Sequence, residues 1–400
     1  MELPANRLIS LDVLRGLTIA GMIVVNDPGS WAYVYPPLRH ADWHGITPTD
    51  FVFPFFLFIV GVSIVLAYTR RKTSGAPKRE MVQKIFKRSA IIFGLGVFLW
   101  LFPGFDFSNV RLPGVLQRIA LVFMACSLIF LNSNWKFQAQ LGAVLLLGYW
   151  FLLAFVPVPI DETIRLALET GEVKAAGGQL KIGELTKLSE SFIAANLEPG
   201  ANLQAWMDRL IIPLRLYQYT WDPEGLLSTL PSIATGITGM MAGHLLLSDK
   251  TKQEKAFFLL LAGFISMSLG NVWDWFFPFN KNLWSSSFVL YTSGLATMTL
   301  GATYYLIDVR NWEGKILFPF KVFGANAIAA YVLHGVFARF FGMKIGSGEE
   351  AQSLKGIFMD MGMTTGFSGE FTSLCYALLY TAFIYVFVWW MYKQRIFLKV

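Results

Sequence analysis

Residues 40–67 read HADWHGITPTDFVFPFFLFIVGVSIVLA, and this stretch decides the fold class of the chain. The run from Phe51 to Ala67 carries no charged residue, so it predicts a membrane-spanning helix. Residues 40–50 directly precede that helix and contain two of the chain's four histidines and two carboxylates. A polar segment at the mouth of a span can hold chemistry, so this segment is the first candidate site.

Several residues of this segment also have a purely structural interpretation. Trp43 suits an interfacial anchor, Thr47 or Thr49 suits a helix cap, and Asp50 suits a first helical turn, where the helix dipole favours a carboxylate. The two histidines are not explained in this way, because imidazole is neither a good cap nor apolar. We therefore favour a proton-handling role for at least one of them.

The composition places the chain among membrane proteins. Of its 400 residues, 55% are hydrophobic and only 15% are charged, with a mean hydropathy of +0.51. Polar surface is too scarce to cover a soluble globule. The net charge of +7 is concentrated in short loops between apolar runs, as the positive-inside rule expects, so it predicts topology and not a nucleic-acid partner.

Targeting and cysteine signals are weak. Residues 1–7 form a short polar tip, and the apolar run after it contains Asp12 and Arg15, so we expect the first span to be retained and not cleaved. Cys126 and Cys375 both lie in apolar stretches, which favours buried thiols over a disulfide or a metal site.

Ten apolar runs predict an all-α fold, a polytopic bundle of transmembrane helices that forms a single domain over residues 1–400. The loop at 70–88 holds eight basic residues against the single acid Glu80, which places it in the cytoplasm. Alternation then puts both termini in the cytoplasm and the His40 segment outside. The expected spans are residues 8–26, 50–69, 88–103, 114–131, 138–156, 226–247, 255–277, 285–307, 317–341 and 372–392.

Residues 157–225 are the largest polar stretch and fall outside the cytoplasm in this topology. Helical patterns at 162–172 and 182–196 alternate with glycine and proline breaks, so we expect a small, ordered helical cap over the span mouths. A partly disordered connector is the alternative.

Polar residues also occur where lipid is expected. Asp12 and Arg15 lie one helical turn apart, which fits either a wet interior or a structural ion pair. Arg118, about one turn inside the fourth span, requires an anionic partner. His334, two turns after Asn326, is more typical of a packing histidine than of a catalyst.

Two further polar turns fall on the same face as His40 in this topology, namely Asp222–Gly225 and Asn280–Trp284. Each can simply cap a helix. Together with the His40 segment they concentrate carboxylates, imidazoles, amides and one ammonium at one membrane face, which is the make-up of a site for a polar small molecule.

Seven short motifs occur in an order that resembles the heparan-α-glucosaminide N-acetyltransferase family and its bacterial relatives. Several motifs in one order are more specific than any single motif. They extend over essentially the whole membrane domain and are SLDVLRG (10–16), HADWHG (40–45), DFVFP (50–54), PGVLQR (113–118), DPEG (222–225), NKNLW (280–284) and GANAI (324–328).

The resemblance implies that an acetyl group from cytosolic acetyl-CoA is passed across the bilayer to the amine of a glucosamine-type sugar. It also implies that His40 is the active-site residue. Family members carry an amide where this chain has His44, so the second imidazole is a departure from the pattern. The large lumenal domain of the lysosomal members is missing from this sequence, so we expect a multi-pass protein of the bacterial inner membrane with an acceptor of its own.

The predicted site follows from these motifs and from the needs of acyl transfer, which are a base for the amine proton and donors for the oxyanion. We expect no metal in it, and acetyl-CoA as donor. His40 and Asp50 are the predicted catalytic residues. The predicted substrate-binding residues are Asp42, Trp43, His44, Asp222, Glu224, Lys281 and Asn282, and the predicted acetyl-CoA-binding residues are Arg15, Arg118 and Asn326.

Some alternatives stay open at this point. His40 can act as a general base in direct transfer, which we favour slightly, or can itself be acetylated and then attacked by the amine. A transporter for an amino sugar is the rival class, although we find no pair of short, broken helices in the two halves of the chain. The expected partners are an amino sugar or oligosaccharide and membrane lipid. The glycine-rich residues 236–243 would permit a homodimer.

Overall fold

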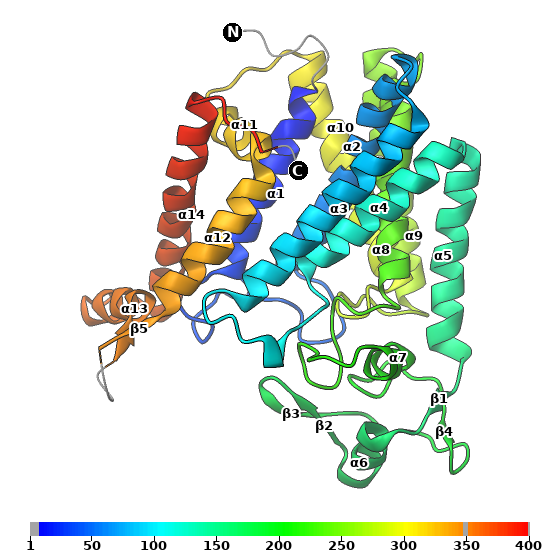
Figure 1. The fold of residues 1–400 in the computed structure, drawn as a ribbon, viewed down its shortest axis with the longest axis vertical. Helices are drawn as coiled ribbons and strands as arrows, with labels where there is room; N and C mark the ends of the chain where they lie inside the picture. The colour runs from blue at the N-terminus through cyan, green and yellow to red at the C-terminus, as the bar shows by residue number, and fades with distance from the viewer. Residues whose placement is uncertain (1–7, 347–350, 399–400) are drawn as a thin grey trace.

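The computed structural model describes residues 8–346 and 351–398. Long helices run side by side through most of the molecule, and residues 157–225 gather beyond one end of them (Figure 1). We call this the cap end, and we call the other end, which carries the loop between α2 and α3, the basic end. Both chain termini, which the sequence analysis predicts to be cytoplasmic, lie outside the described residues.

A helix occupies each predicted span, and the ninth span is divided into two helices. The mainly helical fold is therefore confirmed. The long helices, with the two halves of the divided span, are α1 (Ile9–Asn26), α2 (Val52–Thr73), α3 (Lys78–Leu101), α4 (Val115–Asn132), α5 (Trp135–Phe155), α8 (Thr229–Leu247), α9 (Lys252–Asp274), α10 (Ser286–Tyr304), α11 (Leu317–Ala325), α12 (Ala327–Gly342) and α14 (Gly369–Lys393).

Seven helices in the described ranges are long and apolar enough to cross a membrane, or eight if the bent pair α11–α12 forms one span. Two predicted spans do not qualify. Even the last 18 residues of α3 contain Lys84, Lys87 and Arg88, and α10 carries seven serine and threonine residues. The number of ten spans therefore stays a prediction.

The ninth predicted span is not a continuous helix, because α11 and α12 meet at an angle of 86°. The break falls at Asn326, whose backbone leaves the helical region (φ −130°, ψ 42°). The Asn326 side chain donates to the carbonyl oxygen of Ile396 (2.9 Å) and accepts from the backbone N–H of Leu398 (3.1 Å). The break thus holds the chain segment that follows α14.

Residues 157–225 form an ordered layer packed on the cap end. Helix α6 (Glu162–Thr170) is capped by Asp161 and confirms the first helical pattern, and α7 (Leu203–Ile211) is capped by Asn202. The second predicted helix, at 182–196, is wrong, because Phe192 and Ile193 form strand β4. The short strands are β1 (Val158–Pro159) paired with β4 (Phe192–Ile193), and β2 (Glu172–Ala175) paired with β3 (Gly178–Lys181).

The remaining elements are short and lie at the ends of the long helices. The chain turns into α2 through η2 (Pro48–Phe51), and α13 (Leu354–Thr364) lies near the start of α14 (Figure 1). The others are η1 (Pro36–Leu38), η3 (Phe107–Asn109), the π-turn η4 (Tyr305–Val309), and the strand pair β5 (Lys344–Ile345) and β6 (Gln352–Ser353).

Helices α2 and α8 approach closely because glycines face each other's backbone. A Cβ atom on Gly61 would lie 1.9 Å from the carbonyl oxygen of Gly236, and one on Gly239 would lie 2.0 Å from that of Phe58. Small residues permit such close packing of helices in a membrane. The glycine-rich residues 236–243, which suggested a dimer interface, are thus used within the chain.

The helices divide into central and peripheral ones. In α1, α4 and α8, 61% of the apolar window is buried inside the protein, against 22% in α5 and α9. The exposed flanks of α5 and α9 are rich in large apolar side chains such as Leu147, Phe151, Phe264 and Leu269. This is the pattern expected of outer helices that face lipid, with the polar site built from the central ones.

Candidate active site

His40 is held at the cap end by a buried carboxylate ten residues further along the chain. His40 Nδ1 lies 2.7 Å from Oδ1 of Asp50, and the Asp50 side chain is 1% exposed. The other carboxylate oxygen, Oδ2, accepts from the backbone N–H of Ala41 (3.2 Å) and from both the N–H (3.0 Å) and Oγ1 (3.1 Å) of Thr47. Asp50 therefore caps η2 and orients His40 at the same time.

Lys281 brings an ammonium group to the same imidazole from the turn between α9 and α10. Its Nζ lies 3.0 Å from Nδ1 and 3.2 Å from Nε2 of His40, and 3.8 Å from Oδ1 of Asp50. Burial lowers the pKa of Lys281 below the ordinary lysine value, and the charges of Asp50 and Glu224 oppose that shift only in part.

Hydrogen bonds within the α9–α10 turn fix the position of Lys281. The backbone N–H of Leu283 donates to Oδ1 of Asn280 (2.8 Å), and Oγ of Ser285 accepts from the N–H of Asn280 (3.0 Å) while donating to the Pro278 carbonyl (2.8 Å). The N–H of Gly45 also donates to the carbonyl of Phe279 (2.8 Å). The turn and the His40 segment are thus joined.

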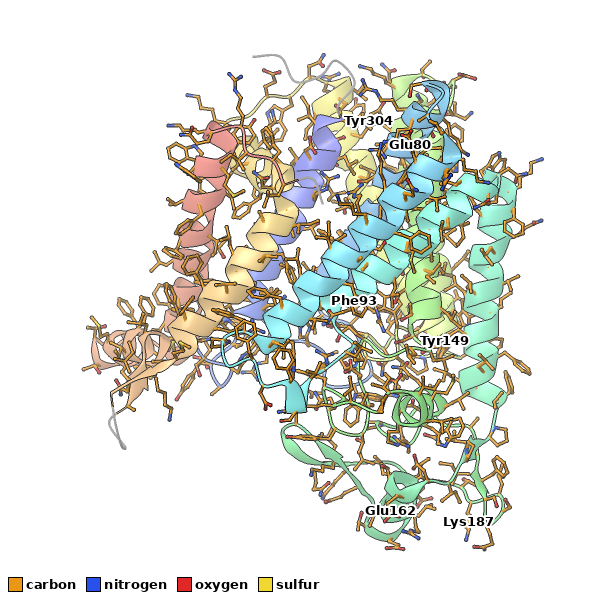
Figure 2. All side chains as sticks on the ribbon, in the orientation of Figure 1. Glu80, Phe93, Tyr149, Glu162, Lys187 and Tyr304 are labelled. Carbon is orange, nitrogen blue, oxygen red and sulfur yellow. The ribbon has the colours of Figure 1, made fainter. Side chains whose placement is uncertain are left out.

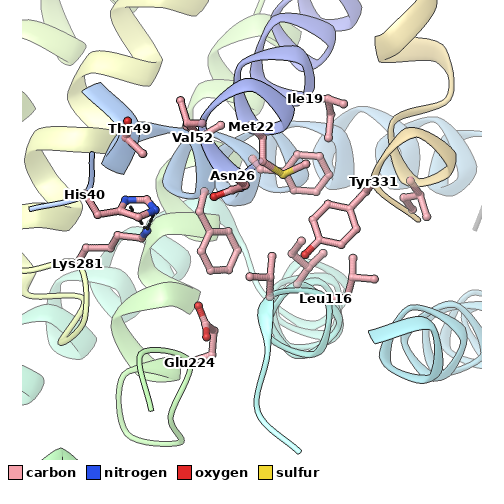
Figure 3. A pocket seen from close by; sticks show the side chains of 16 residues that line it. Ile19, Met22, Asn26, His40, Thr49, Val52, Leu116, Glu224, Lys281 and Tyr331 are labelled. Carbon is pink, nitrogen blue, oxygen red and sulfur yellow. Dashed lines mark hydrogen bonds between the residues drawn. The ribbon is translucent and has the colours of Figure 1, made fainter. Parts of the chain in front are cut away.

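His40 and Lys281 line a cavity of about 650 Å³ that is partly open to solvent. Figure 3 shows their side chains on one wall, Glu224 below them, and the Tyr331 hydroxyl pointing in from the opposite side. The remaining wall is mostly apolar and comes from α1, α2, α4 and α12, through Ile19, Met22, Val25, Val52, Phe53, Phe56, Val115, Leu116, Ile119 and Ile328, with Asn26 and Thr49 adding polar atoms.

Glu224 is the carboxylate that faces this cavity. Its Oε2 accepts from Arg111 Nη2. The same guanidinium binds Asp222 through two bonds, from Nε to Oδ2 (2.8 Å) and from Nη2 to Oδ1 (2.6 Å). The pKa of Arg111 is raised by these two carboxylates, against the effect of burial. Asp222 is fully buried and positions Arg111 and Glu224, whereas Glu224 lines the cavity.

The loop that carries Glu224 is also held by Asp208 of α7. Oδ1 of Asp208 accepts from the backbone N–H of Leu226 (2.8 Å), and Oδ2 lies where a Cβ atom on Gly225 would need to be. Asp208 is completely buried, and burial raises its pKa to about 7. The cap layer thus controls the position of a cavity residue.

The other predicted substrate-binding residues do not line the cavity. Asp42 and His44 are exposed, and Nδ1 of His44 lies 3.4 Å from the amide nitrogen of Asn280. Trp43 donates from Nε1 to the carbonyl of Leu197 (2.9 Å) and contacts Trp221 edge-on, which joins the His40 segment to the cap. Asn282 accepts from the Gln204 side chain through its backbone carbonyl (3.2 Å).

The three predicted acetyl-CoA-binding residues also lie away from the cavity wall. Arg15 contacts Asp12 (3.1 Å) and Ser63 (2.9 Å), which links α1 to α2. Arg118 is buried, donates to the Gly225 carbonyl (3.0 Å) and to Ser228 Oγ, and lies over the Trp284 ring. Asn326 binds the segment after α14, as described above.

Sequence reasoning missed Asn26, Thr49 and Tyr331 as cavity residues. Asn26 had a signal, because it follows Arg15, Ile19 and Met22 at helical spacing on one face of α1. Tyr331 had none, because a tyrosine in an apolar helix is usually a packing residue.

Among the described residues, no group of three or more His, Cys, Asp or Glu side chains is arranged to hold a metal ion.

Comparison with known proteins bears on this site. Residues 7–167 match the family described as heparan-alpha-glucosaminide N-acetyltransferase, catalytic. Over 382 residues the chain is 31% identical to the human protein named heparan-alpha-glucosaminide N-acetyltransferase, and over 384 residues it is 32% identical to the mouse protein of that name. The resemblance to this family is therefore confirmed.

The similarity covers 84% of this chain and 54% of each relative, so the chain spans about half the length of the curated relatives that it matches. The segment that matches the heparan-α-glucosaminide N-acetyltransferase family model includes His40 and Asp50, the histidine and carboxylate of the candidate site. Lys281 and Glu224 come from beyond that segment, and the fold brings them to the same cavity.

Proposed function

We propose that this protein is a transmembrane N-acetyltransferase that moves acetyl from cytosolic acetyl-CoA to the amine of a glucosamine-type sugar on the other side of the membrane. The observation that carries the proposal is that His40 contacts both Asp50 and Lys281 on the wall of a mostly apolar cavity. The names of the two mammalian relatives supply the reaction class.

His40 is the proposed general base. With Nδ1–H donated to Asp50, Nε2 carries the lone pair that takes the proton of the attacking amine, and the Asp50 carboxylate stabilises the imidazolium that results. The amine nitrogen forms a bond to the thioester carbonyl carbon, the carbon–sulfur bond breaks, and the CoA thiolate leaves with the proton that His40 has taken up. This direct transfer needs no covalent enzyme intermediate.

Lys281 is the proposed donor to the oxyanion. Its ammonium lies beside Nε2 of His40, so a carbonyl oxygen next to the base is also within its reach. A charge fixed in a mostly apolar cavity stabilises a developing oxyanion far better than one in water. Glu224, which faces the cavity near Lys281, is the proposed partner of the acceptor amine before it reacts.

The two ends of the bundle support a transfer across the membrane. The proposed cytoplasmic loop lies at the basic end, where Figure 2 labels Glu80, whereas Glu162 and Lys187 of residues 157–225 lie at the opposite end. His40 belongs to the segment that joins α1 and α2 at the cap end. The proposed location is the bacterial inner membrane, with both termini cytoplasmic, so acetyl-CoA would enter from the basic end and the sugar from the cap end.

The test is acetylation of glucosamine by the purified protein in liposomes, with labelled acetyl-CoA as donor. We expect product from the wild type and a loss of about 10²- to 10⁴-fold in kcat for His40→Ala, the usual contribution of a positioned general base. His44→Ala is the matched control, because it changes an exposed histidine of the same segment that does not line the cavity. The kcat of His44→Ala should stay near the wild-type value.

Three results would change the proposal. Wild-type turnover by His40→Ala would remove His40 from the chemistry. Uptake of unmodified glucosamine into the liposomes, with no acetylated product, would favour the transporter. Incubation with labelled acetyl-CoA and no acceptor separates the two chemical routes, because a stable acetyl-histidine would replace direct transfer by a two-step mechanism.

A further inference from the structure

A second cavity, of about 800 Å³, adjoins the one that holds His40. The two cavities share four lining residues, which are Asn26, Val115, Leu116 and Tyr331. These side chains face both cavities, so the second cavity begins beside the first and continues between α3, α4 and α12. None of the residues assigned to the reaction above lines this second cavity.

One of the two positive charges that line the second cavity has no acidic partner among the described residues. The cavity is lined by two arginines, Arg111 and Arg339, and none of the described lining residues is acidic. Arg111 is already paired with Asp222 and Glu224. Within the described part of the chain, the guanidinium of Arg339 makes one hydrogen bond, from Nη1 to the Gly335 carbonyl of its own helix (2.7 Å).

Neutral polar groups accompany Arg339. His334 is 8% exposed and lines the same cavity, and its Nδ1 has no hydrogen-bond partner among the described residues. Gln117 is buried against Gly96 and Gly114 and also lines the cavity. A buried imidazole nitrogen without a partner is costly, so it indicates that a ligand or water completes the site.

A purely structural role for Arg339 explains its surroundings less well than anion binding does. An arginine at the end of a transmembrane helix can extend its side chain toward the interface. Arg339 is only partly exposed, however, and borders a cavity without an acidic partner, which is costly in a membrane protein. A planar guanidinium with free N–H groups suits two oxygens of one carboxylate, sulfate or phosphate.

We propose that the second cavity is an anion subsite in which Arg339 binds an acidic group of a molecule whose reacting end lies at His40. Only the identity of that molecule rests on the proposed function. A glucosaminide with a carboxylate on its second sugar would reach this cavity from the cap end, where the lining parts of α3, α4 and α12 lie. The phosphates of the acyl donor offer the same chemistry but would reach it only if the donor also entered from the cap end, and the experiment below distinguishes the two sources.

The experiment measures equilibrium binding to the purified full chain, which requires no turnover and is independent of the transferase proposal. Two pairs of probes are compared: a glucosaminyl-uronate disaccharide with its methyl ester, and CoA with pantetheine, which lacks the phosphates. In the wild type we expect the anionic member of at least one pair to bind more tightly. Arg339→Gln should lower the affinity for that anionic probe by about 10- to 100-fold and leave the affinity for the neutral probe unchanged.

The controls keep the test decisive. Lys344→Gln removes an exposed positive charge just beyond α12, outside the cavity, and should change no affinity. Arg339→Lys keeps the positive charge but lacks the planar guanidinium, so its affinity for the anionic probe should fall only several-fold. This variant also tests the contact if Arg339→Gln does not fold. Equal binding within both pairs by the wild type, or unchanged binding by Arg339→Gln, would overturn the subsite.

Discussion

His40 contacts two groups of opposite charge, to which we assign different roles. The carboxylate of Asp50 accepts hydrogen bonds from the backbone as well as from His40, so its position does not depend on the ligand. The ammonium of Lys281 contacts both ring nitrogens, so it already lies beside the place where the substrate carbonyl oxygen would be. A fixed orienting group and a donor held next to the base suit acyl transfer.

The buried Asp208 makes the stability of the protein depend on pH. Its pKa of about 7 in the folded state lies above the ordinary value of 3.8. Between these values the folded state binds more protons than the unfolded state, so stability falls as pH rises toward 7. Arg118 and Arg209 favour the charged form, while burial and the neighbouring Asp222 oppose it.

Asp208→Asn should remove much of this dependence. The amide oxygen can still accept from the Leu226 N–H, and no charge has to be buried. Between pH 5 and pH 8, we expect the free energy of unfolding of the wild type to fall by on the order of 2–4 kcal/mol because of this group, and that of the variant to change little. Thermal unfolding in detergent across that range measures the difference, with the exposed Glu190→Gln as control. Parallel curves for wild type and Asp208→Asn would contradict the assignment.

The residue types of the candidate site could be predicted from the sequence, but most of the contacts between those residues could not. Asp50 follows His40 within one short segment, and that proximity made the pair predictable. Glu224 and Asp222 look alike in the motif, yet only Glu224 lines the cavity. Arg111, more than a hundred residues away in the sequence, binds both oxygens of the buried Asp222 but only Oε2 of Glu224, and such a contact could not be predicted from the motif.

At the scale of elements, the crossing of α2 and α8 determines where the His40 segment sits, because that segment leads directly into α2. Gly239→Ala would place a Cβ atom 2.0 Å from the Phe58 carbonyl oxygen, so the two helices would have to separate. We expect a loss of about 1–3 kcal/mol in stability, the usual cost of overpacking, with lower acetyl transfer.

Gly148→Ala is the matched control for this prediction. It also lies within a long helix, but a Cβ atom there would meet nothing within 4 Å. This variant should be neutral or more stable by about 0.5–1 kcal/mol, because alanine favours a helix more than glycine does. Thermal unfolding of both variants decides the point. Equal melting temperatures would mean that the close approach of α2 and α8 is not needed.

The two elements that were predicted wrongly from the sequence were mispredicted for the same reason. Residues 182–196 have a helical pattern, but Phe192 and Ile193 pair with β1, and Ile193 packs with Val158 and Tyr149 against the cap end. The apolar run 317–341 has the length of one span, yet it bends at Asn326, where the side chain binds the segment after α14. In both places a contact distant in sequence overrides the local pattern.

At the scale of the whole molecule, the proposed reaction requires that the basic end and the cap end face opposite sides of the membrane. Lys84 of α3 lies toward the basic end, and Glu190 lies in the cap layer, and both side chains are exposed. Cysteines placed at these two positions, in a chain whose Cys126 and Cys375 are replaced by alanine, report the sidedness directly.

A membrane-impermeant maleimide should label Glu190→Cys in intact cells and Lys84→Cys only after the membrane is opened. The physical reason is the excess of lysine and arginine around the α2–α3 loop, which holds that end in the cytoplasm. The reverse labelling would place His40 on the cytoplasmic side, where donor and acceptor could meet without any transfer across the bilayer. Labelling at both positions before opening would mean that the chain inserts in two orientations, and a single direction of transfer would then be lost.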